Sequence, residues 1–368
     1  MARRKAGWLG AWTALSKVAT KHTLKTQKKV STNVAKIVGK AVGEASAKNA
    51  AKVGAATRRV LTGVISPAPA PTNRGSGHWQ EGHWGLGPLA QRKYRLFTPE
   101  GVSRKHPARL LVLLHGCGQD SASFAASTHA AAIARAQGCM VLLPEQSSHA
   151  NAQRCWNWFR SDARVATEAM LLMAIVERVC SQHFVQHDAV YLLGMSAGGS
   201  MALTMALRYP DRFAGVVCHS GAVPHSAANA VQATHAMQGH RGPDNATLKN
   251  ALTGRRLPPL LLLHGDHDRT VVPDNALASA GLWLELLPGA ASAMPAPVPT
   301  PGRLLQRGAR KACTINDWKT AGRLYVRLIR IAGLGHAWSG GAAHQAFSDP
   351  AGPDALKLAL RFFDDCAT

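Results

Sequence analysis

The chain has 368 residues, of which 46% are apolar and 17% are charged, and 34 of them are glycines. This composition is typical of a soluble globular protein and excludes a collagen, a coiled coil and a wholly disordered chain. The length predicts about two domains, although one open α/β sheet can account for much of it. No run of about 18 apolar residues occurs, so we expect no membrane-spanning helix.

Positive charge is concentrated near the N-terminus. The formal net charge is +23, and residues 1–66 contain 14 Lys and Arg but a single acidic residue, Glu44. The other residues contain 29 Lys and Arg against 19 Asp and Glu. This asymmetry predicts a basic arm at residues 1–66 that meets an anionic surface, such as phospholipid, nucleic acid or a storage inclusion.

Within this arm, apolar residues recur every three or four positions, from Trp8 and Trp12 to Val42, with lysines between them. The pattern predicts amphipathic helices that lie on an interface. A helix packed against the rest of the chain and a disordered basic tail are the open alternatives. Residues 67–77 are rich in Pro and then in Gly, and they predict a linker to a domain at residues 78–368.

The first residues form only a weak candidate for an export signal. The cationic residues 1–5 precede a mildly apolar run at 7–15, but this run is short and lysines follow it. Seven cysteines are scattered without a close C-x-x-C pair, so neither a zinc site nor a compact disulfide framework is indicated. We therefore expect a cytoplasmic protein, with secretion as the alternative.

After the linker, short strands rich in Val and Leu alternate with helices. Strands are predicted at 92–97, 110–114, 140–143, 190–193, 214–218, 260–263 and 324–331, and helices at 121–137, 162–180, 197–208, 275–285 and 354–363. The alternation predicts an α/β fold with a mostly parallel central sheet that helices cover on both faces. Sites in such sheets lie at the carboxyl ends of the strands. Residues 288–301, rich in Pro and Ala, predict an exposed loop.

The strongest motif is Gly194-Met-Ser-Ala-Gly198, which lies between a predicted strand and a predicted helix. A Gly-x-Ser-x-Gly sequence alone is a weak signal, but between a strand and a helix it predicts a nucleophile elbow, which holds the serine at the edge of the sheet. The two glycines allow neighbouring backbone to come close to this turn. Ser196 is therefore the candidate nucleophile, and a simple tight turn is the alternative.

A serine nucleophile needs a base, and the base needs an orienting acid, which precedes the histidine in the chain in this architecture. Asp266 and Asp268 follow one predicted strand, and His336 lies in a glycine-rich loop after the last predicted strand. We expect His336 to be the base and Asp268 the acid, with Asp266 as the alternative. His264, at the end of its strand, is expected to be structural.

Acyl transfer also needs backbone N–H donors that bind the developing oxyanion. One donor is expected from Ala197, directly after the nucleophile, and the other from the loop His115-Gly-Cys-Gly-Gln119. In that loop the amide of Cys117 is the predicted donor. A nucleophilic role for Cys117 is the weaker hypothesis, because its thiol would need a base of its own. This chemistry implies no metal and no organic cofactor.

Five motifs in chain order resemble those of the polyhydroxybutyrate depolymerase type esterases, a branch of the α/β hydrolases that also includes feruloyl and acetylxylan esterases. The resemblance covers roughly residues 78–345. It rests on His115-Gly-Cys-Gly-Gln119, Cys155-Trp-Asn-Trp-Phe159, Gly194-Met-Ser-Ala-Gly-Gly199, His264-Gly-Asp-His-Asp268 and Gly335-His-Ala-Trp-Ser-Gly-Gly341. The opening Gly77-His-Trp79 and Gly82-His-Trp-Gly-Leu-Gly87 resemble the intracellular branch, which acts on storage granules.

The resemblance implies an α/β-hydrolase fold and a set of site residues: the triad Ser196, Asp268 and His336, the oxyanion donors Cys117 and Ala197, and three cleft walls, Trp156, Trp158 and Trp338. Flat apolar rings suit an acyl chain. Core packing is the alternative for Trp156 and Trp158.

The resemblance leaves two questions open. A disulfide between Cys117 and Cys155 would lie beside the site, but a cytoplasmic setting argues against it. No convincing export signal and no appended C-terminal domain of the kind found in secreted members is expected here, which favours an intracellular, amorphous or oligomeric ester.

We therefore expect a serine esterase that hydrolyses short-chain hydroxyacyl polyesters, above all stored polyhydroxybutyrate. A second hypothesis keeps the triad but assigns aryl or acetyl esters of plant polysaccharide, or small soluble esters. A third makes the protein chiefly a binder, with residues 1–66 on polyester granules or, less favoured, on nucleic acid.

Overall fold

The structure, a computed structural model, describes residues 76–85, 90–243, 245–252, 255–287 and 300–367. They belong to the compact unit Asn73–Thr368. The predicted basic arm at 1–66, nearly all of the linker at 67–77 and most of the predicted loop at 288–301 lie outside the described residues. Among the described helices, none has the length and apolar character that crossing a bilayer requires.

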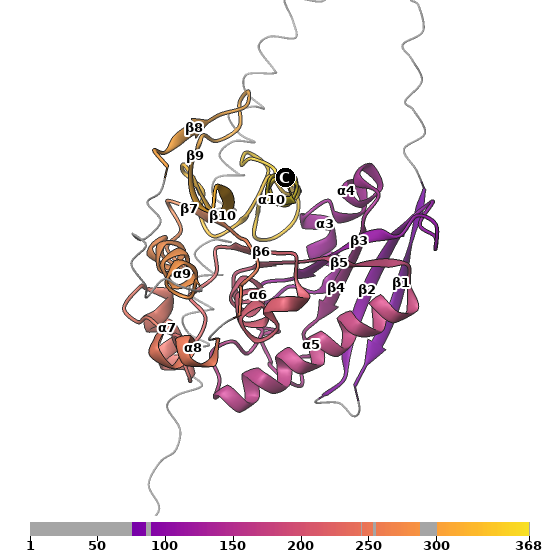
Figure 1. Cartoon of the computed structure of the whole chain (residues 1–368), viewed down its shortest axis with the longest axis horizontal. Coiled ribbons are helices and arrows are strands. Elements are labelled where there is room, and N and C mark those ends of the chain that lie inside the picture. The colour runs from indigo at the N-terminus through magenta and orange to yellow at the C-terminus, as the bar shows by residue number, and fades with distance from the viewer. Residues whose placement is uncertain (1–75, 86–89, 244, 253–254, 288–299, 368) are drawn as a thin grey trace, which may run out of the picture. The chain divides into compact units, whose positions relative to one another are not determined.

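A mixed sheet forms the centre of this unit (Figure 1). Within the described residues it has ten strands, in the order β1 (Gly77–Trp84), β2 (Arg92–Pro99), β4 (Met140–Glu145), β3 (Ala108–Leu114), β5 (Val185–Met195), β6 (Gly215–His219), β7 (Leu260–Gly265), β10 (Arg323–Ile331), β9 (Cys313–Thr320) and β8 (Arg303–Leu305). The six strands from β4 to β10 run parallel, and antiparallel strands flank them on both sides. The predicted mostly parallel sheet is confirmed.

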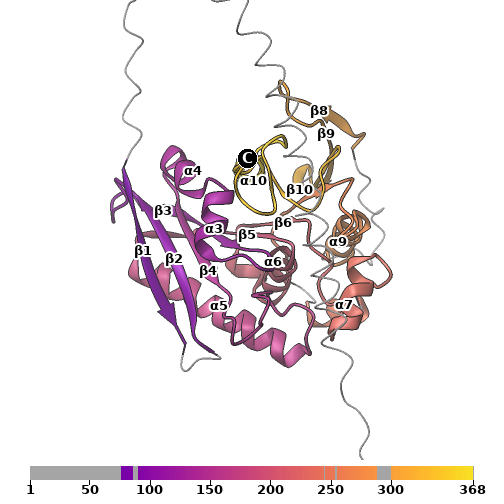
Figure 2. The same cartoon turned by 180° about the vertical axis from the view of Figure 1, so that it is seen from behind.

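Helices cover both faces of the sheet, as predicted (Figures 1 and 2). On one face, Leu110 and Val112 of β3 belong to the core that includes α5 (Asp162–Gln182), α6 (Ala197–Arg208) and α9 (Asp274–Glu285). On the other face, Leu111 of β3 belongs to the core that includes α3 (Ser121–Ser127), α4 (Ala130–Gln137) and α10 (Ala355–Ala367). Successive residues of a strand point to opposite faces, so the leucine-rich strands build both cores at once.

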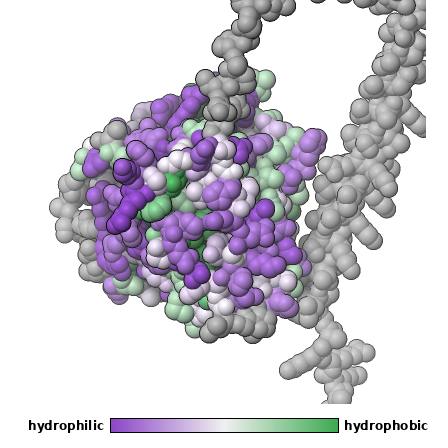
Figure 3. Space-filling model, turned by 90° about the vertical axis from the view of Figure 1, so that its right-hand side faces the viewer, coloured by the Kyte–Doolittle hydropathy of each residue, from purple (hydrophilic) through white to green (hydrophobic). Residues whose placement is uncertain are grey.

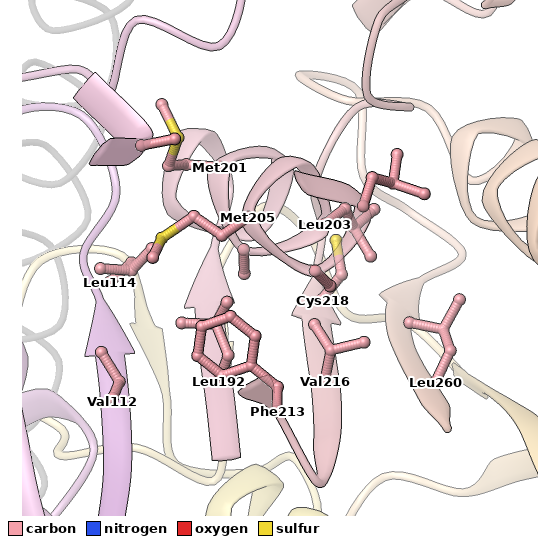
Figure 4. Close-up of a cluster of buried hydrophobic side chains, with 14 of the residues drawn as sticks. Val112, Leu114, Leu192, Met201, Leu203, Met205, Phe213, Val216, Cys218 and Leu260 are labelled. Atoms are coloured by element: carbon pink, nitrogen blue, oxygen red, sulfur yellow. The ribbon is translucent and has the colours of Figure 1, made fainter. Parts of the chain in front are cut away.

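The core beneath α6 fixes the helix against the centre of the sheet (Figure 4). Met201 and Met205 of α6 lie above Leu114 and Leu192, which come from the two neighbouring strands β3 and β5. All four side chains are fully buried. Because interiors are close-packed, α6 and its N-terminal residue have little freedom to shift relative to the sheet.

The predicted helix at 121–137 is two helices in the structure, and this corrects the prediction. The Oγ1 of Thr128 donates to the carbonyl of Phe124 at 2.9 Å, at the end of α3. His129 then takes a left-handed conformation with φ 54°, before α4 begins at Ala130. A threonine hydroxyl that donates to a backbone carbonyl competes with continuation of the helix. The alanine-rich sequence on both sides favours a helix, so the break at Thr128 was not predicted.

Several elements were not predicted. They are the edge strands β1, β8 and β9, the short strands β11 (Trp338–Ser339) and β12 (Ser348–Asp349), and the helices α7 (Ala230–Met237) and α8 (Asn245–Ala251). Strand β1 is mostly exposed, so it lacks the apolar alternation that identifies a half-buried strand. Figure 3 views the side on which β1 lies, and hydrophilic residues cover most of it. Polar residues on an edge strand oppose pairing with another chain.

A buried ion pair links the start of β2 to α5. Arg92 Nη2 lies 3.1 Å from Glu168 Oε1, and both side chains are almost fully buried. Glu168 also accepts hydrogen bonds from the side chain of Gln146 and, at 2.6 Å, from the backbone N–H of Asn157. Since Gln146 Nε2 also donates to the carbonyl of Cys155 at 3.0 Å, this network holds residues 155–157 beside the sheet.

The change Glu168→Gln should therefore destabilise the fold strongly. Removing one partner of a buried pair leaves the other charge uncompensated, which costs about 3–5 kcal/mol. The matched control is Glu177→Gln on the same helix, where an exposed Glu pairs with Arg212 and should contribute about 1 kcal/mol or less. Urea unfolding of both variants measures this, and equal losses would contradict a structural role for the buried pair.

Candidate active site

Ser196 lies at the turn between β5 and α6, with φ 55° and ψ −122°. The flanking glycines are required by close backbone contact: a Cβ on Gly194 would collide with the carbonyl of Gly198, and a Cβ on Gly198 with the carbonyl of Leu114 at the end of β3. The Ser196 N–H donates to the carbonyl of His219 at 2.8 Å. This geometry is a nucleophile elbow, with the serine at the carboxyl edge of the parallel sheet.

The structure brings the three predicted triad residues together. His336 Nε2 lies 2.9 Å from Ser196 Oγ, and His336 Nδ1 lies 2.7 Å from Asp268 Oδ2. A carboxylate can only accept, so Nδ1–H donates to Asp268, and Nε2 is left to accept the serine proton. Ser196 and His336 are partly exposed, whereas Asp268 is buried. A substrate can therefore reach the hydroxyl and the imidazole.

Hydrogen bonds keep the buried Asp268 ionised. Burial raises the pKa of this carboxyl, but hydrogen bonds from His264 and His336 outweigh burial and hold the pKa well below its ordinary value. Oδ1 accepts the backbone N–H groups of Thr270 at 2.9 Å and Val271 at 3.0 Å. Asp266, the alternative acid, is instead exposed and accepts the N–H of Gly333 at 2.7 Å.

Two histidines beside the triad have structural contacts. His264 Nε2 lies 2.8 Å from the carbonyl of Val271 and 3.5 Å from Asp268 Oδ2. His219, which the sequence analysis missed, is buried, and burial lowers its pKa to about 3. Its neutral Nε2 accepts the N–H of Ser339 at 3.2 Å, in the segment that follows His336. The sequence signal that could have identified His219 was its position at the end of a buried strand.

The loop after β3 supplies the second side of the site. A Cβ on Gly116 would lie 3.6 Å from the Cβ of Ser196, so this loop passes beside the nucleophile. Gln119 holds the loop, because its Oε1 accepts the N–H of Gly116 at 2.9 Å. Within the described chain, the backbone N–H groups of Cys117 and Ala197 have no acceptor, which leaves both available to an oxyanion.

Cys117 and Cys155 form a disulfide in the structure, the pairing that the sequence left open. It ties the loop of the predicted oxyanion donor to the segment that the Arg92–Glu168 network holds. The cross-link restricts the movement of Cys117 relative to Ser196.

The three predicted cleft tryptophans pack into the interior. Trp156 is fully buried, and its Nε1 donates to the carbonyl of His115 at 2.9 Å. Trp338 is 1% exposed and stacks on His219, with ring centroids 5.1 Å apart. These two rings have no face for a substrate in this structure. Trp158 is also buried, and it lines a cavity of about 210 Å³.

Within the described residues, no cluster of three or more His, Cys, Asp or Glu side chains could hold a metal ion. The chemistry available here is that of a hydroxyl with a hydrogen-bonded base, a buried carboxylate and backbone donors. Together these groups are suited to nucleophilic attack of the serine hydroxyl on a carbonyl carbon.

Comparison with known proteins identifies similar esterases. The family model described as "Esterase PHB depolymerase" matches residues 92–296. The poly(3-hydroxyalkanoate) depolymerase C of Paucimonas lemoignei is 31% identical over 186 residues, which cover 48% of this chain and 44% of the relative. The feruloyl esterase B of Neurospora crassa is 28% identical over 222 residues, which cover 56% of this chain and 73% of the relative.

Among solved structures, the acetyl xylan esterase from Aspergillus awamori superposes with a TM-score of 0.60 at 18% identity, over 78% of this chain and all of that one. This likeness shows the fold. The likeness in fold, together with the strand order and the elbow of this chain, confirms the predicted α/β-hydrolase fold.

The low pKa of Asp268 predicts a pH-dependent contribution to stability. A carboxyl whose pKa is lower in the folded state stabilises the fold above its ordinary pKa of 3.8, and this stabilisation is lost as the pH falls. At pH 7, Asp268→Asn should cost about 1.5–3 kcal/mol, as expected for hydrogen bonds to a charged group. The difference in unfolding free energy between this variant and the wild type should become smaller below about pH 4.

Asp266→Asn is the matched control in the same loop, because it removes an exposed carboxylate with one backbone partner. Urea unfolding at pH 7 and pH 3 measures both variants. The assigned hydrogen bonds would be contradicted if the loss of unfolding free energy in Asp268→Asn were the same at both pH values, or no larger than the loss in Asp266→Asn.

Proposed function

This chain belongs to the esterase PHB depolymerase family, and we propose that it is a carboxylic ester hydrolase that cleaves short-chain polyhydroxyalkanoates through a Ser196 acyl-enzyme. The observation that carries the mechanism is the unbroken contact from Ser196 Oγ through His336 to the buried Asp268. The observation that favours the polyester is the 31% identity to a poly(3-hydroxyalkanoate) depolymerase. That relative is more than twice as long as the matched region, so its substrate is carried over here as a proposal.

In the proposed first step, His336 Nε2 takes the Ser196 proton while Oγ attacks the ester carbonyl carbon. The carbonyl oxygen becomes an oxyanion, which accepts hydrogen bonds from the N–H groups of Cys117 and Ala197. Asp268 stabilises the imidazolium that forms. The C–O bond then breaks, and His336 returns its proton to the alcohol oxygen that leaves.

In the second step, water replaces the alcohol. His336 takes a proton from this water, and its oxygen attacks the acyl carbon of the ester on Ser196. Collapse of the second tetrahedral intermediate breaks the bond to Oγ, which regains its proton from His336. The products are a free carboxylic acid and the original enzyme.

A second candidate function keeps this mechanism and changes the substrate. The feruloyl esterase B of Neurospora crassa matches a longer region than the depolymerase does, 222 against 186 residues, at 28% identity. This similarity favours aryl or acetyl esters of polysaccharide as the alternative substrates. The triad geometry is common to both, so substrate turnover has to distinguish them.

The full chain should hydrolyse amorphous polyhydroxybutyrate and p-nitrophenyl butyrate, with little turnover of methyl ferulate. Release of soluble hydroxybutyrate, p-nitrophenol and ferulate measures the three activities. Ser196→Ala should lower kcat on every hydrolysed ester by about 10³-fold or more, because it removes the nucleophile.

The matched control is Ser200→Ala, one turn later on α6, which keeps the nucleophile. Turnover of methyl ferulate alone would overturn the polyester proposal and favour the second candidate. Retained turnover in Ser196→Ala would overturn the mechanism itself.

A further inference from the structure

His219 lies beside the nucleophile at the carboxyl edge of the sheet. It is the last residue of β6, the strand between β5 and β7 (Figure 1). Its backbone carbonyl accepts the N–H of Ser196 at 2.8 Å. This bond anchors the nucleophile at the turn, where the φ of Ser196 is 55° and left-handed. The main chain of His219 therefore holds one member of the triad.

The side chain of His219 contacts the segment that carries the base. Nε2 lies 3.2 Å from the backbone nitrogen of Ser339, and the ring stacks on Trp338, with ring centroids 5.1 Å apart. These two residues follow His336 in the chain, with one residue between. Because Ser339 and His219 are both fully buried, water does not readily replace the lost acceptor if the ring is removed. The ring of His219 therefore holds the segment of a second triad member.

These contacts determine the protonation state of the ring. A backbone N–H can only donate, so Nε2 is an acceptor and the proton of the neutral ring is on Nδ1. Nδ1 lies 3.1 Å from Ser220 Oγ, to which it donates. Burial lowers the pKa of His219 to about 3, so the ring stays neutral and Nε2 keeps its lone pair. Unlike His336, this histidine is suited to hold a backbone group and not to carry a proton during the reaction.

The backbone around His336 depends on hydrogen bonds for its position. A Cβ on Gly335 would meet no atom within 4 Å other than its chain neighbours, so close packing does not fix this residue. Before the base, the carbonyl of Leu334 accepts a backbone N–H from the loop after β7 at 3.1 Å. After the base, the bond from Ser339 to the ring of His219 connects the segment to the end of β6. Loss of that bond would let the base move relative to the nucleophile.

We propose that His219 is a positioning residue that sets the distance between Ser196 Oγ and His336 Nε2. Its carbonyl holds the nucleophile and its Nε2 holds the base segment, so one buried residue connects the two. The inference rests on the proposed function, because it concerns the proton transfer between these two atoms. Without the acceptor at Nε2, the imidazole would lose its 2.9 Å contact with the serine hydroxyl. A displacement of about 1 Å in a catalytic group costs up to about 100-fold in rate.

The test compares His219→Gln with His219→Asn in the full chain. Both variants replace the ring with an amide, but the Gln oxygen takes the position of Nε2, within reach of Ser339, and the Asn oxygen takes the position of Nδ1. We expect His219→Asn to lower kcat for p-nitrophenyl butyrate by about 10- to 100-fold. KM should stay within about twofold of the wild type, because the base acts in the chemical steps. His219→Gln should keep most of the wild-type kcat, because it retains the acceptor.

Trp283→Phe is the control for a loss of stability alone. Trp283 is fully buried on α9, and its Nε1 donates to the carbonyl of Pro258 at 2.9 Å, so this change also removes one backbone hydrogen bond from a buried ring. It should lower the melting temperature and leave kcat per folded molecule unchanged. If His219→Asn does not fold, His219→Phe, which fills the ring volume without an acceptor, replaces it with the same expected loss. Wild-type kcat in the variant without the acceptor, or an equal loss in His219→Gln, would overturn the proposal.

Amide hydrogen exchange separates this inference from the proposed function. If the wild type hydrolyses no ester, the proposed function fails, but the mobility of the base segment can still be measured by mass spectrometry. Exchange in residues 333–341 should be faster in His219→Asn than in the wild type, and close to the wild type in His219→Gln and Trp283→Phe. Unchanged exchange in His219→Asn would overturn the positioning role of His219, whatever the activity of the wild type.

Discussion

The close approach of α6 to the ends of β3 and β5 is the constraint on which the site depends. Gly198 lies against the carbonyl of Leu114, and Gly194 against the carbonyl of Gly198, at distances that no side chain would allow. This contact fixes the turn at Ser196 and also sets the oxyanion loop beside it, since that loop starts where β3 ends. The buried methionines of α6 hold the helix in place from below. One backbone contact thus positions both Ser196 and the loop that contains the predicted oxyanion donor Cys117.

A second set of contacts braces the oxyanion loop from the other side. The disulfide joins Cys117 to Cys155, and the buried Glu168 holds the residues next to Cys155 through the N–H of Asn157. Glu168 is in turn paired with Arg92.

The sequence predicted the parts of the fold and the site that local pattern determines. Leucine-rich runs identified the parallel strands because burial on both faces leaves a continuous apolar signature. The elbow was recognisable because steric exclusion requires glycine at two positions around Ser196. The expected chain order of the triad indicated an acid and then a histidine after Ser196, but it did not distinguish Asp268 from Asp266. In the structure Asp268 accepts the hydrogen bond of the His336 imidazole, whereas Asp266 accepts the N–H of Gly333.

Tertiary packing determined what the sequence could not predict. A tryptophan in a motif loop serves equally as a cleft wall or as core, and the burial of Trp156 and Trp338 follows from neighbours distant in the chain. Strand β1 pairs with the edge of β2, and the residues of β1 themselves show little of the apolar alternation that predicts a strand. The cavity that Trp158 lines was equally hidden, because its lining includes Arg160, His225 and Arg241, which are far apart in the sequence.

The central claim is that Ser196 is an activated nucleophile in the folded protein. An alkyl fluorophosphonate reacts with such a serine, and mass spectrometry of the digested protein locates the adduct. We predict one phosphonyl group, on the peptide that contains Ser196, together with loss of p-nitrophenyl butyrate hydrolysis in proportion to labelling. Hydrolysis that survives complete labelling of Ser196, or an inactivating adduct on any other residue, would contradict the claim.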